Sequence, residues 1–258
     1  MEQALTFADP AGRAVSGILA TPQDGSDRLA VLCHGFLSNK DSSTNKALTA
    51  LLVERGIATF RFDFFGQGDS EGPFERITTT AAVAQARAAL DLVASRGYSR
   101  LGLMGSSFGG LIATLVAASQ PAPQGIPLSA LALKCPALDF PEILRLEFGE
   151  AGMDRWKRMN VIPNLTGGSE PFPLRFEFYE DCLTYDAYKA AESIRAPVMI
   201  VQGDRDESVP LHQSRRLFDA IRAEKRLELL SGADHRFSRP EDFQTMTRLL
   251  ADWLTTYL

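Results

Sequence analysis

The chain has 258 residues, of which 45% are hydrophobic and 23% charged, and its formal net charge is −5 at pH 7. This length and apolar content suffice for one large core, so we expect residues 1–258 to form a single domain. The acidic balance argues against nucleic acid as a partner, because a protein that binds a phosphate backbone needs a basic face.

The first predicted elements are two antiparallel strands. Residues 3–8 and 13–20 alternate apolar and polar side chains on either side of the turn sequence Asp9-Pro10-Ala11-Gly12. Such alternation around a turn is typical of a β-hairpin.

From residue 29 onward, short apolar runs alternate with helical patterns. The predicted strands are 29–33, 56–62, 101–104, 129–135, 198–202 and 227–230, and the predicted helices lie near 43–55, 78–96, 108–119, 211–223 and 240–257. This alternation predicts crossover units and a mostly parallel central sheet with helices on both faces.

The segment 136–193 interrupts the alternation. It is rich in aromatic residues and contains Pro163, Pro171, Pro173 and the flexible run Thr166-Gly167-Gly168-Ser169. A structureless loop of this length is improbable in a compact domain, so we interpret 136–193 as an inserted cap, or lid, over a site. The alternative is a second layer of core-packing helices with no role toward a substrate.

The strongest motif is Gly105-Ser106-Ser107-Phe108-Gly109, which lies between the predicted strand 101–104 and the predicted helix 108–119. A strand, a sharp Gly-x-Ser-x-Gly turn and a helix form a nucleophile elbow. The serine at the apex adopts a strained backbone, so its neighbours must lack bulky side chains. We predict Ser107 as the nucleophile.

A serine nucleophile needs a base, and the chain has only three histidines. In the fold that carries this elbow, the chain order is Ser, then Asp or Glu, then His. His34 precedes Ser107, and His212 starts a predicted helix, where a surface position is favoured. His235 lies in a loop between the last strand and the last helix, so we predict it as the base.

The acid is expected on the loop after the strand 198–202, which offers three carboxylates: Asp204, Asp206 and Glu207. Asp206 lies in the middle of the loop and is best placed to reach His235, whereas Asp204 is expected to stabilise the turn and Glu207 to be solvated. Asp139, after the strand 129–135, is the outside candidate.

An oxyanion hole is predicted from two backbone amides. The run Cys33-His34-Gly35-Phe36 follows another strand, and an N–H group from that loop joins the N–H of the residue after the nucleophile. Phe36 and Phe108 would supply these amides, and His34 is expected to brace the loop rather than to catalyse.

No cofactor or metal is predicted. The Gly-rich run 64–72 lacks the spacing of a dinucleotide loop and is interpreted as a structural turn, and no phosphate-loop motif or metal-ligand cluster is visible. The cysteines, Cys33, Cys135 and Cys182, lack paired spacing and suit a reducing compartment. Without a visible signal sequence or a bilayer-spanning apolar stretch, a cytoplasmic protein with no membrane insertion is expected.

At these residues the chain resembles the α/β-hydrolase superfamily, and more narrowly the bacterial feruloyl (cinnamoyl) esterases and related carboxylesterases. The narrower likeness lies in His34-Gly35-Phe36 with Asn39-Lys40-Asp41 and in the length of the cap. The resemblance implies the α/β-hydrolase fold and a cofactor-independent serine mechanism. It maps Ser107, Asp206 and His235 to the triad. One departure is Ser106, where such esterases often carry His.

The predicted function is hydrolysis of small or aromatic acyl esters through a Ser-His-Asp triad and an acyl-enzyme. We expect cap residues to bind this small-molecule substrate, namely Trp156, Phe172, Phe176 and Tyr179. The cap holds about eleven acidic and six basic residues between 137 and 193, which disfavours strongly anionic substrates. The alternatives are a thioesterase or monoacylglycerol lipase-like enzyme, and a non-catalytic binding module on the same fold.

Overall fold

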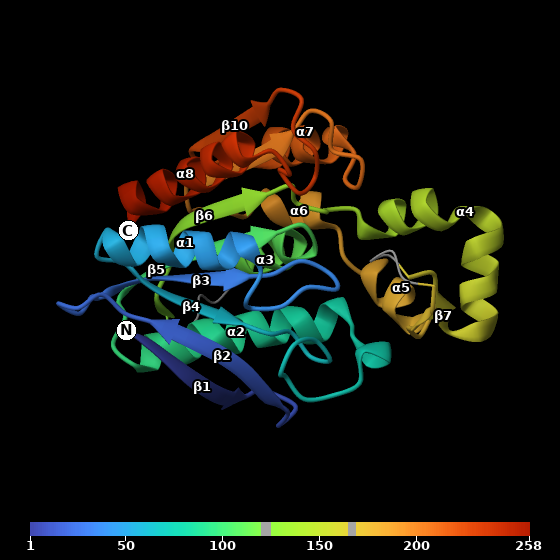
Figure 1. Cartoon of the computed structure of the whole chain (residues 1–258), viewed down its shortest axis with the longest axis horizontal. Helices are drawn as coiled ribbons and strands as arrows, with labels where there is room; N and C mark the ends of the chain where they lie inside the picture. The colour runs from blue at the N-terminus through green and yellow to red at the C-terminus, as the bar shows by residue number, and fades with distance from the viewer. Residues whose placement is uncertain (120–124, 165–168) are drawn as a thin grey trace.

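The computed structural model describes residues 1–119, 125–164 and 169–258. Within these residues an eight-stranded sheet has the order β1-β2-β4-β3-β5-β6-β9-β10 (Figure 1). The strands are β1 (Glu2–Ala8), β2 (Ala14–Ala20), β3 (Arg28–Cys33), β4 (Ala58–Phe62), β5 (Arg100–Ser106), β6 (Leu128–Lys134), β9 (Val198–Gly203) and β10 (Lys225–Leu230).

The pairing of the strands confirms the predicted sheet. β1 pairs with β2, and β2 with β4, in antiparallel fashion, while the remaining neighbours from β4 to β10 are parallel. The turn of the N-terminal hairpin is held by Asp9, whose carboxylate accepts hydrogen bonds from the backbone N–H groups of Ala11 and Arg13.

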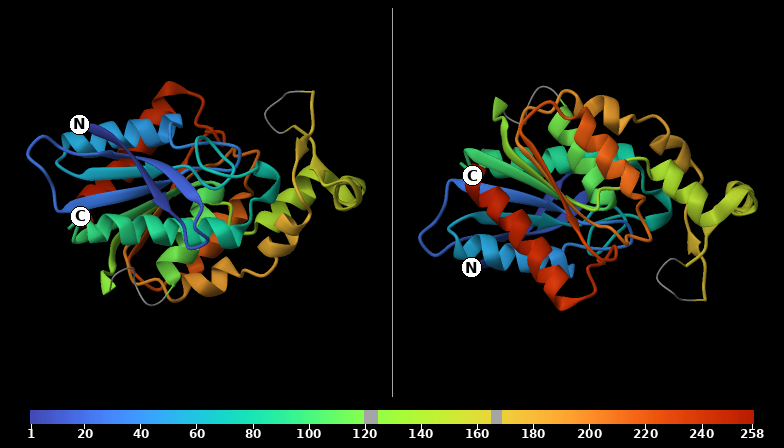
Figure 2. Two further views of the ribbon diagram at one scale, coloured as in Figure 1. Left: turned by 90° about the horizontal axis from the view of Figure 1, so that it is seen from below. Right: turned by 90° about the horizontal axis from the view of Figure 1, so that it is seen from above.

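Helices cover both faces of the sheet, as predicted (Figures 1 and 2). One face carries α1 (Ser43–Glu54) and α8 (Pro240–Tyr257), which pack against each other. The other carries α2 (Thr79–Ser95), α3 (Phe108–Ala118), α6 (Ala187–Ala191) and α7 (Leu211–Ala220). Helix α7 ends at Ala220 rather than near residue 223, because Ile221 adopts an extended backbone with ψ 132°.

The alternation of side chains along the strands divides the core between the two faces. In β3, Leu29 and Val31 pack into the cluster beneath α2 and α3, whereas Ala30 and Leu32 pack into the cluster beneath α1 and α8. All four are fully buried. Burial on both faces explains why the parallel strands are continuous apolar runs in the sequence.

The segment 136–193 contains α4 (Phe140–Met159), β7 (Val161–Ile162), β8 (Phe172–Pro173), α5 (Glu177–Cys182) and α6. Helix α4 is kinked at Gly149, whose φ of 62° interrupts the helical backbone. The part from α4 to α5 projects beyond the carboxyl ends of the central strands (Figure 1). Residues 166–168 of the predicted flexible run lie outside the described residues. Among the described residues, no helix is long and apolar enough to span a bilayer.

Candidate active site

Ser107 lies at a sharp turn between β5 and α3, with φ 53° and ψ −117°, a backbone conformation that non-glycine residues rarely adopt. The flanking glycines are required by close backbone contacts. A Cβ atom on Gly105 would lie 2.2 Å from the carbonyl oxygen of Gly109, and one on Gly109 would lie 2.4 Å from the carbonyl oxygens of Cys33 and His34. The sequence motif is therefore a packed elbow that presents Ser107 at the end of the sheet.

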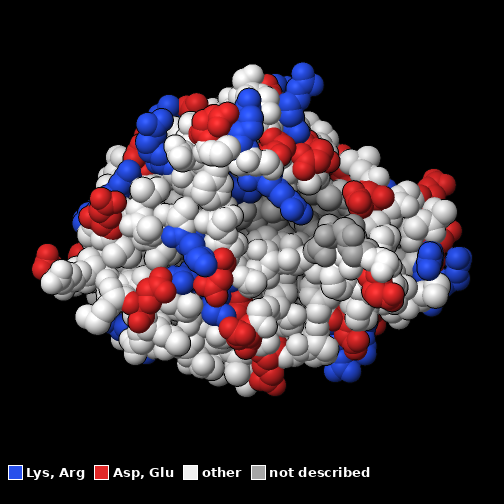
Figure 3. All heavy atoms as spheres, viewed as in Figure 1, with Lys and Arg blue, Asp and Glu red and all other residues white. Residues whose placement is uncertain are grey.

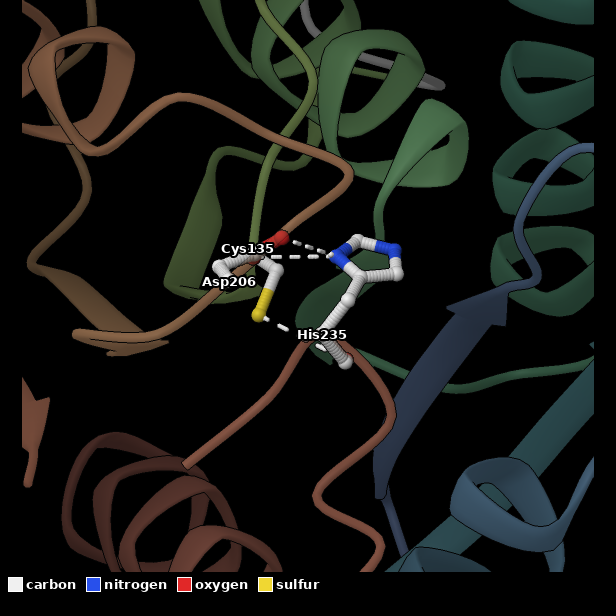
Figure 4. A group of neighbouring side chains, drawn as sticks. All are labelled: Cys135, Asp206 and His235. Atoms are coloured by element: carbon white, nitrogen blue, oxygen red, sulfur yellow. Dashed lines mark hydrogen bonds and ion pairs between the residues drawn. The ribbon is translucent and has the colours of Figure 1, made fainter. Parts of the chain in front are cut away.

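Asp206 and His235 are joined by a short contact between two loops. The Nδ1 atom of His235 lies 3.0 Å from Oδ1 and 2.9 Å from Oδ2 of Asp206 (Figure 4). The carboxylate is almost completely buried, and the imidazole is 14% exposed. If Nδ1–H donates to the carboxylate, Nε2 is left as a proton acceptor.

Asp206 is held in its ionised form. Its Oδ1 atom accepts hydrogen bonds from the backbone N–H groups of Ser208 (3.0 Å) and Val209 (2.8 Å), and its Oδ2 atom accepts one from Nε2 of Gln202 (3.1 Å). Burial opposes ionisation, but the hydrogen bonds from His235 and Val209 outweigh it and hold the pKa of Asp206 below its ordinary value.

Ser107 and His235 line one cavity of about 520 Å³. In the described part of the chain, no hydrogen bond joins Ser107 Oγ to the imidazole. Catalytic hydrogen bonds are often longer in free enzymes than in complexes with substrate. The two side chains thus share a cavity in which a substrate could contact both.

One of the two predicted oxyanion amides lies at this cavity. Phe36 lines it, and Phe108 is the first residue of α3, where backbone N–H groups have no partner within the helix. Among the described residues, neither amide donates a hydrogen bond to another backbone group. Phe36 also packs its ring against that of Phe108, with 6.0 Å between the ring centroids.

His34 braces the loop, as predicted. Its side chain is fully buried, Nδ1 lies 2.8 Å from the carbonyl oxygen of Gly35, and Nε2 lies 3.0 Å from the backbone nitrogen of Phe64. Because the backbone N–H of Phe64 can only donate, Nε2 accepts and Nδ1 carries the proton. Burial lowers the pKa of His34 to about 4, so the imidazole is neutral at pH 7.

The burial of His34 predicts a pH dependence of stability. Between the ordinary histidine pKa near 6.5 and the folded value of about 4, the unfolded chain binds a proton that the folded chain does not. Stability present above pH 6.5 should therefore fall by about 3 kcal/mol as the pH decreases through this window. Urea denaturation of wild type and His34→Gln would measure it, with His212→Gln as control. Equal losses in wild type and His34→Gln would contradict the prediction.

The other candidate acids and bases have different partners. Asp139 accepts a hydrogen bond from the backbone N–H of Glu142 and caps α4. His212 is 60% exposed and lies 3.0 Å from Glu142. Asp204 accepts from the backbone N–H of Gly232 and stabilises the turn, while Glu207 is exposed and accepts from the backbone N–H of His235.

The four predicted substrate-binding residues do not line the cavity at Ser107. Trp156 is 1% exposed and donates from Nε1 to the carbonyl oxygen of Leu174, so it belongs to the packing of segment 136–193. Phe172 packs against the ring of Phe74. Phe176 and Tyr179 line a separate cavity of about 490 Å³ beside α4.

Several residues at the cavity were not expected from the sequence. Lys134, at the end of β6, and Arg236, next to His235, line it together with Leu37, Ser38 and residues 42–44. Position was the available signal for Lys134, Arg236 and Leu37, because Lys134 ends a strand and the other two directly follow His235 and Phe36. Phe36 is linked to segment 136–193 by Phe140 and Phe178, whose rings lie 5.4 and 5.3 Å from its own.

Cys135 is a further neighbour that the sequence did not indicate. Its Sγ atom, the carboxylate of Asp206 and a ring nitrogen of His235 all lie within 4.8 Å of one another (Figure 4). These atoms could serve as metal ligands. However, burial raises the pKa of the thiol, and His235 Nδ1 is already engaged with Asp206. A metal ion bound here would have to displace the thiol proton and the contact between His235 and Asp206.

Comparisons with known proteins identify the family and the fold of the chain. The model of a family described as alpha/beta hydrolase matches residues 30–244. The mitochondrial palmitoyl-protein thioesterase ABHD10 of Bos taurus is 24% identical over 224 residues, which are 84% of this chain and 70% of that protein.

Two solved structures illustrate the likeness. Est1E from Butyrivibrio proteoclasticus, determined with ferulic acid bound, has a TM-score of 0.85 at 24% identity, over 98% of this chain and 99% of Est1E. Mouse alpha/beta hydrolase domain-containing protein 10 has a TM-score of 0.78 at 19% identity, over 97% of each chain. The predicted α/β-hydrolase fold is thereby confirmed.

Proposed function

Because this chain belongs to the alpha/beta hydrolase family, we propose that it is a serine hydrolase that cleaves carboxylic esters. The observation that carries the proposal is the short contact between Asp206 and His235 beside the cavity that Ser107 lines. A buried carboxylate, an imidazole and a half-buried hydroxyl on a strained elbow are the groups that acyl transfer requires.

In the first half of the reaction, Nε2 of His235 takes the proton of Ser107 Oγ as Oγ bonds to the ester carbonyl carbon. The carbonyl oxygen becomes an oxyanion, and the amides of Phe36 and Phe108 donate hydrogen bonds to it. When the intermediate collapses, the bond to the alcohol oxygen breaks and the alcohol leaves with the proton from His235.

Water completes the reaction. His235 takes a proton from water, and the resulting hydroxide attacks the acyl-enzyme carbonyl through a second oxyanion. Collapse returns the proton to Ser107 Oγ and releases the carboxylic acid. The negative charge of Asp206 stabilises the imidazolium that forms in each half.

The acyl group is proposed to be small or aromatic. Phe36 and Leu37 give the cavity an apolar wall, and the ring of Phe36 packs against Phe178 of segment 136–193. We propose this segment as the cap. In this proposal the cap positions the ring of Phe36, and Phe36 rather than Trp156 contacts the acyl group. Methyl ferulate should then have a higher kcat/KM than methyl butyrate, and equal or slower turnover of the ferulate would remove the aromatic preference.

A thioester substrate is the second candidate, because the curated relative ABHD10 is named a palmitoyl-protein thioesterase. The same residues would attack a thioester, and only the leaving group differs. An acyl chain presented once as an oxygen ester and once as a thioester separates the two functions. A kcat/KM more than tenfold higher for the thioester would favour that function.

A further inference from the structure

The cavity at Ser107 has a positively charged wall. Lys134 and Arg236 line it, and no Asp or Glu is among the described residues that do. Apart from His235, the remaining polar side chains of the wall are uncharged hydroxyls, those of Ser38, residues 42–44 and Ser106–Ser107. Figure 3 shows basic side chains beside the hollow on the face viewed there.

Arg236 is an exposed cation without a counter-ion. Among the described residues its guanidinium has no hydrogen bond, ion pair or aromatic partner. The carboxylates close to it in the sequence or on the facing loop have other partners: Asp206 contacts His235, Glu207 accepts from the backbone N–H of His235, and Asp234 accepts from the backbone N–H of Ser238. A planar guanidinium with five donors matches the two oxygens of a carboxylate or phosphate.

Lys134 is the second cation, and it is buried. The residue is 6% exposed, and its Nζ atom donates to the carbonyl oxygen of His235 at 2.9 Å and lies 5.3 Å from the ring of Phe237. Both partners are uncharged, and no carboxylate in the described structure pairs with it. A buried charge without a counter-ion is costly, so an anion that enters this cavity gains more than it would at an exposed lysine.

We infer that the substrate carries an anionic group, a carboxylate or a phosphate, that Arg236 and Lys134 bind beside Ser107. The inference rests on the proposed function and names its substrate class. The acidic residues of segment 136–193 led us to expect that anionic substrates are disfavoured, and the inference differs from that expectation. The electrostatic potential at the reacting carbonyl depends mainly on the side chains that line the cavity. Exposed charges that lie farther from the reacting carbonyl than the Debye length, about 8 Å in physiological salt, are largely screened.

Matched ester pairs test the inference. On the acyl side, 4-nitrophenyl hemiglutarate and 4-nitrophenyl valerate share the leaving group and the chain length and differ in one terminal carboxylate. On the alcohol side, 4-acetoxybenzoate and its methyl ester form the corresponding pair. For each pair the readout is the ratio of kcat/KM for the anionic ester to that for the neutral one.

For at least one pair, Arg236→Gln should lower this ratio about tenfold, and Arg236→Glu should lower it further. Arg248→Gln makes the same charge change at an exposed position on α8 and should leave the ratio within twofold. The wild-type ratio should also fall as salt is raised from 0.05 to 0.5 M. Competition by glutarate or by inorganic phosphate then distinguishes a carboxylate from a phosphate.

Ratios that stay within twofold in both Arg236 variants for both pairs would overturn the inference. That outcome differs from a failure of the proposed function, in which wild type hydrolyses none of the four esters.

Discussion

Replacing Ser107 by alanine is expected to lower kcat/KM on a 4-nitrophenyl ester by about 10⁴–10⁶. The substitution removes the atom that forms the acyl-enzyme while leaving the elbow glycines, the Asp206–His235 contact and the cavity in place. Water held in the same cavity could still be activated by His235, which accounts for the residual rate.

The control for this variant is Ser95→Ala, which removes a hydroxyl group at the end of α2. Within the described residues this hydroxyl bonds only to the carbonyl oxygen of Leu92. Its turnover should stay within twofold of wild type. Urea denaturation would show that both variants are folded. A Ser107→Ala variant that keeps a tenth of the wild-type activity would refute the assignment of the nucleophile.

The second large effect is expected at Asp206. Asp206→Asn should reduce kcat by about 10³–10⁴, as in comparable triads in which the acid is replaced by its amide. The hydrogen bonds around the carboxylate explain why an isosteric change is so harmful. Two backbone N–H groups, those of Ser208 and Val209, point at Oδ1, so the amide oxygen of asparagine must occupy that position.

The NH₂ group of the asparagine then faces Nδ1 of His235. A donor at this place replaces the nearer acceptor of Nδ1–H and favours the tautomer with the proton on Nε2, in which the imidazole is not a base for Ser107. The matched control is Asp139→Asn, because Asp139 caps α4 and has no contact with His235. If the two variants lost activity equally, Asp206 would not be the residue that orients His235.

Much of this arrangement follows from local sequence. The elbow could be predicted because residues 105–109 combine a preceding apolar strand, two glycines around a serine and a following helix. The chain order Ser, Asp, His then leaves few candidates for the acid and the base. The middle of the loop favoured Asp206 over Asp204 as the partner of His235. In the structure Asp206 contacts His235, whereas Asp204 accepts a hydrogen bond from the backbone N–H of Gly232.

The walls of the cavity could not be predicted in the same way. Trp156 and Arg236 illustrate the reason. An aromatic residue in an inserted segment can line a pocket or pack inside the segment, and only the position of Leu174, which accepts its indole N–H, decides between them. Arg236 gains its place because the ends of β3, β5 and β6 and the loop after β10 converge there, and that convergence is a property of the sheet rather than of the neighbouring sequence.

The central claim is that His235 makes the hydroxyl of Ser107 nucleophilic, and a fluorophosphonate probe tests it most directly. The probe should add once to the wild-type chain, with peptide mass spectrometry placing the adduct on Ser107, and labelling of His235→Ala should be at least a hundredfold slower. An unlabelled wild-type chain would point to a binding module, and an adduct on another residue, or unchanged labelling of His235→Ala, would contradict the claim.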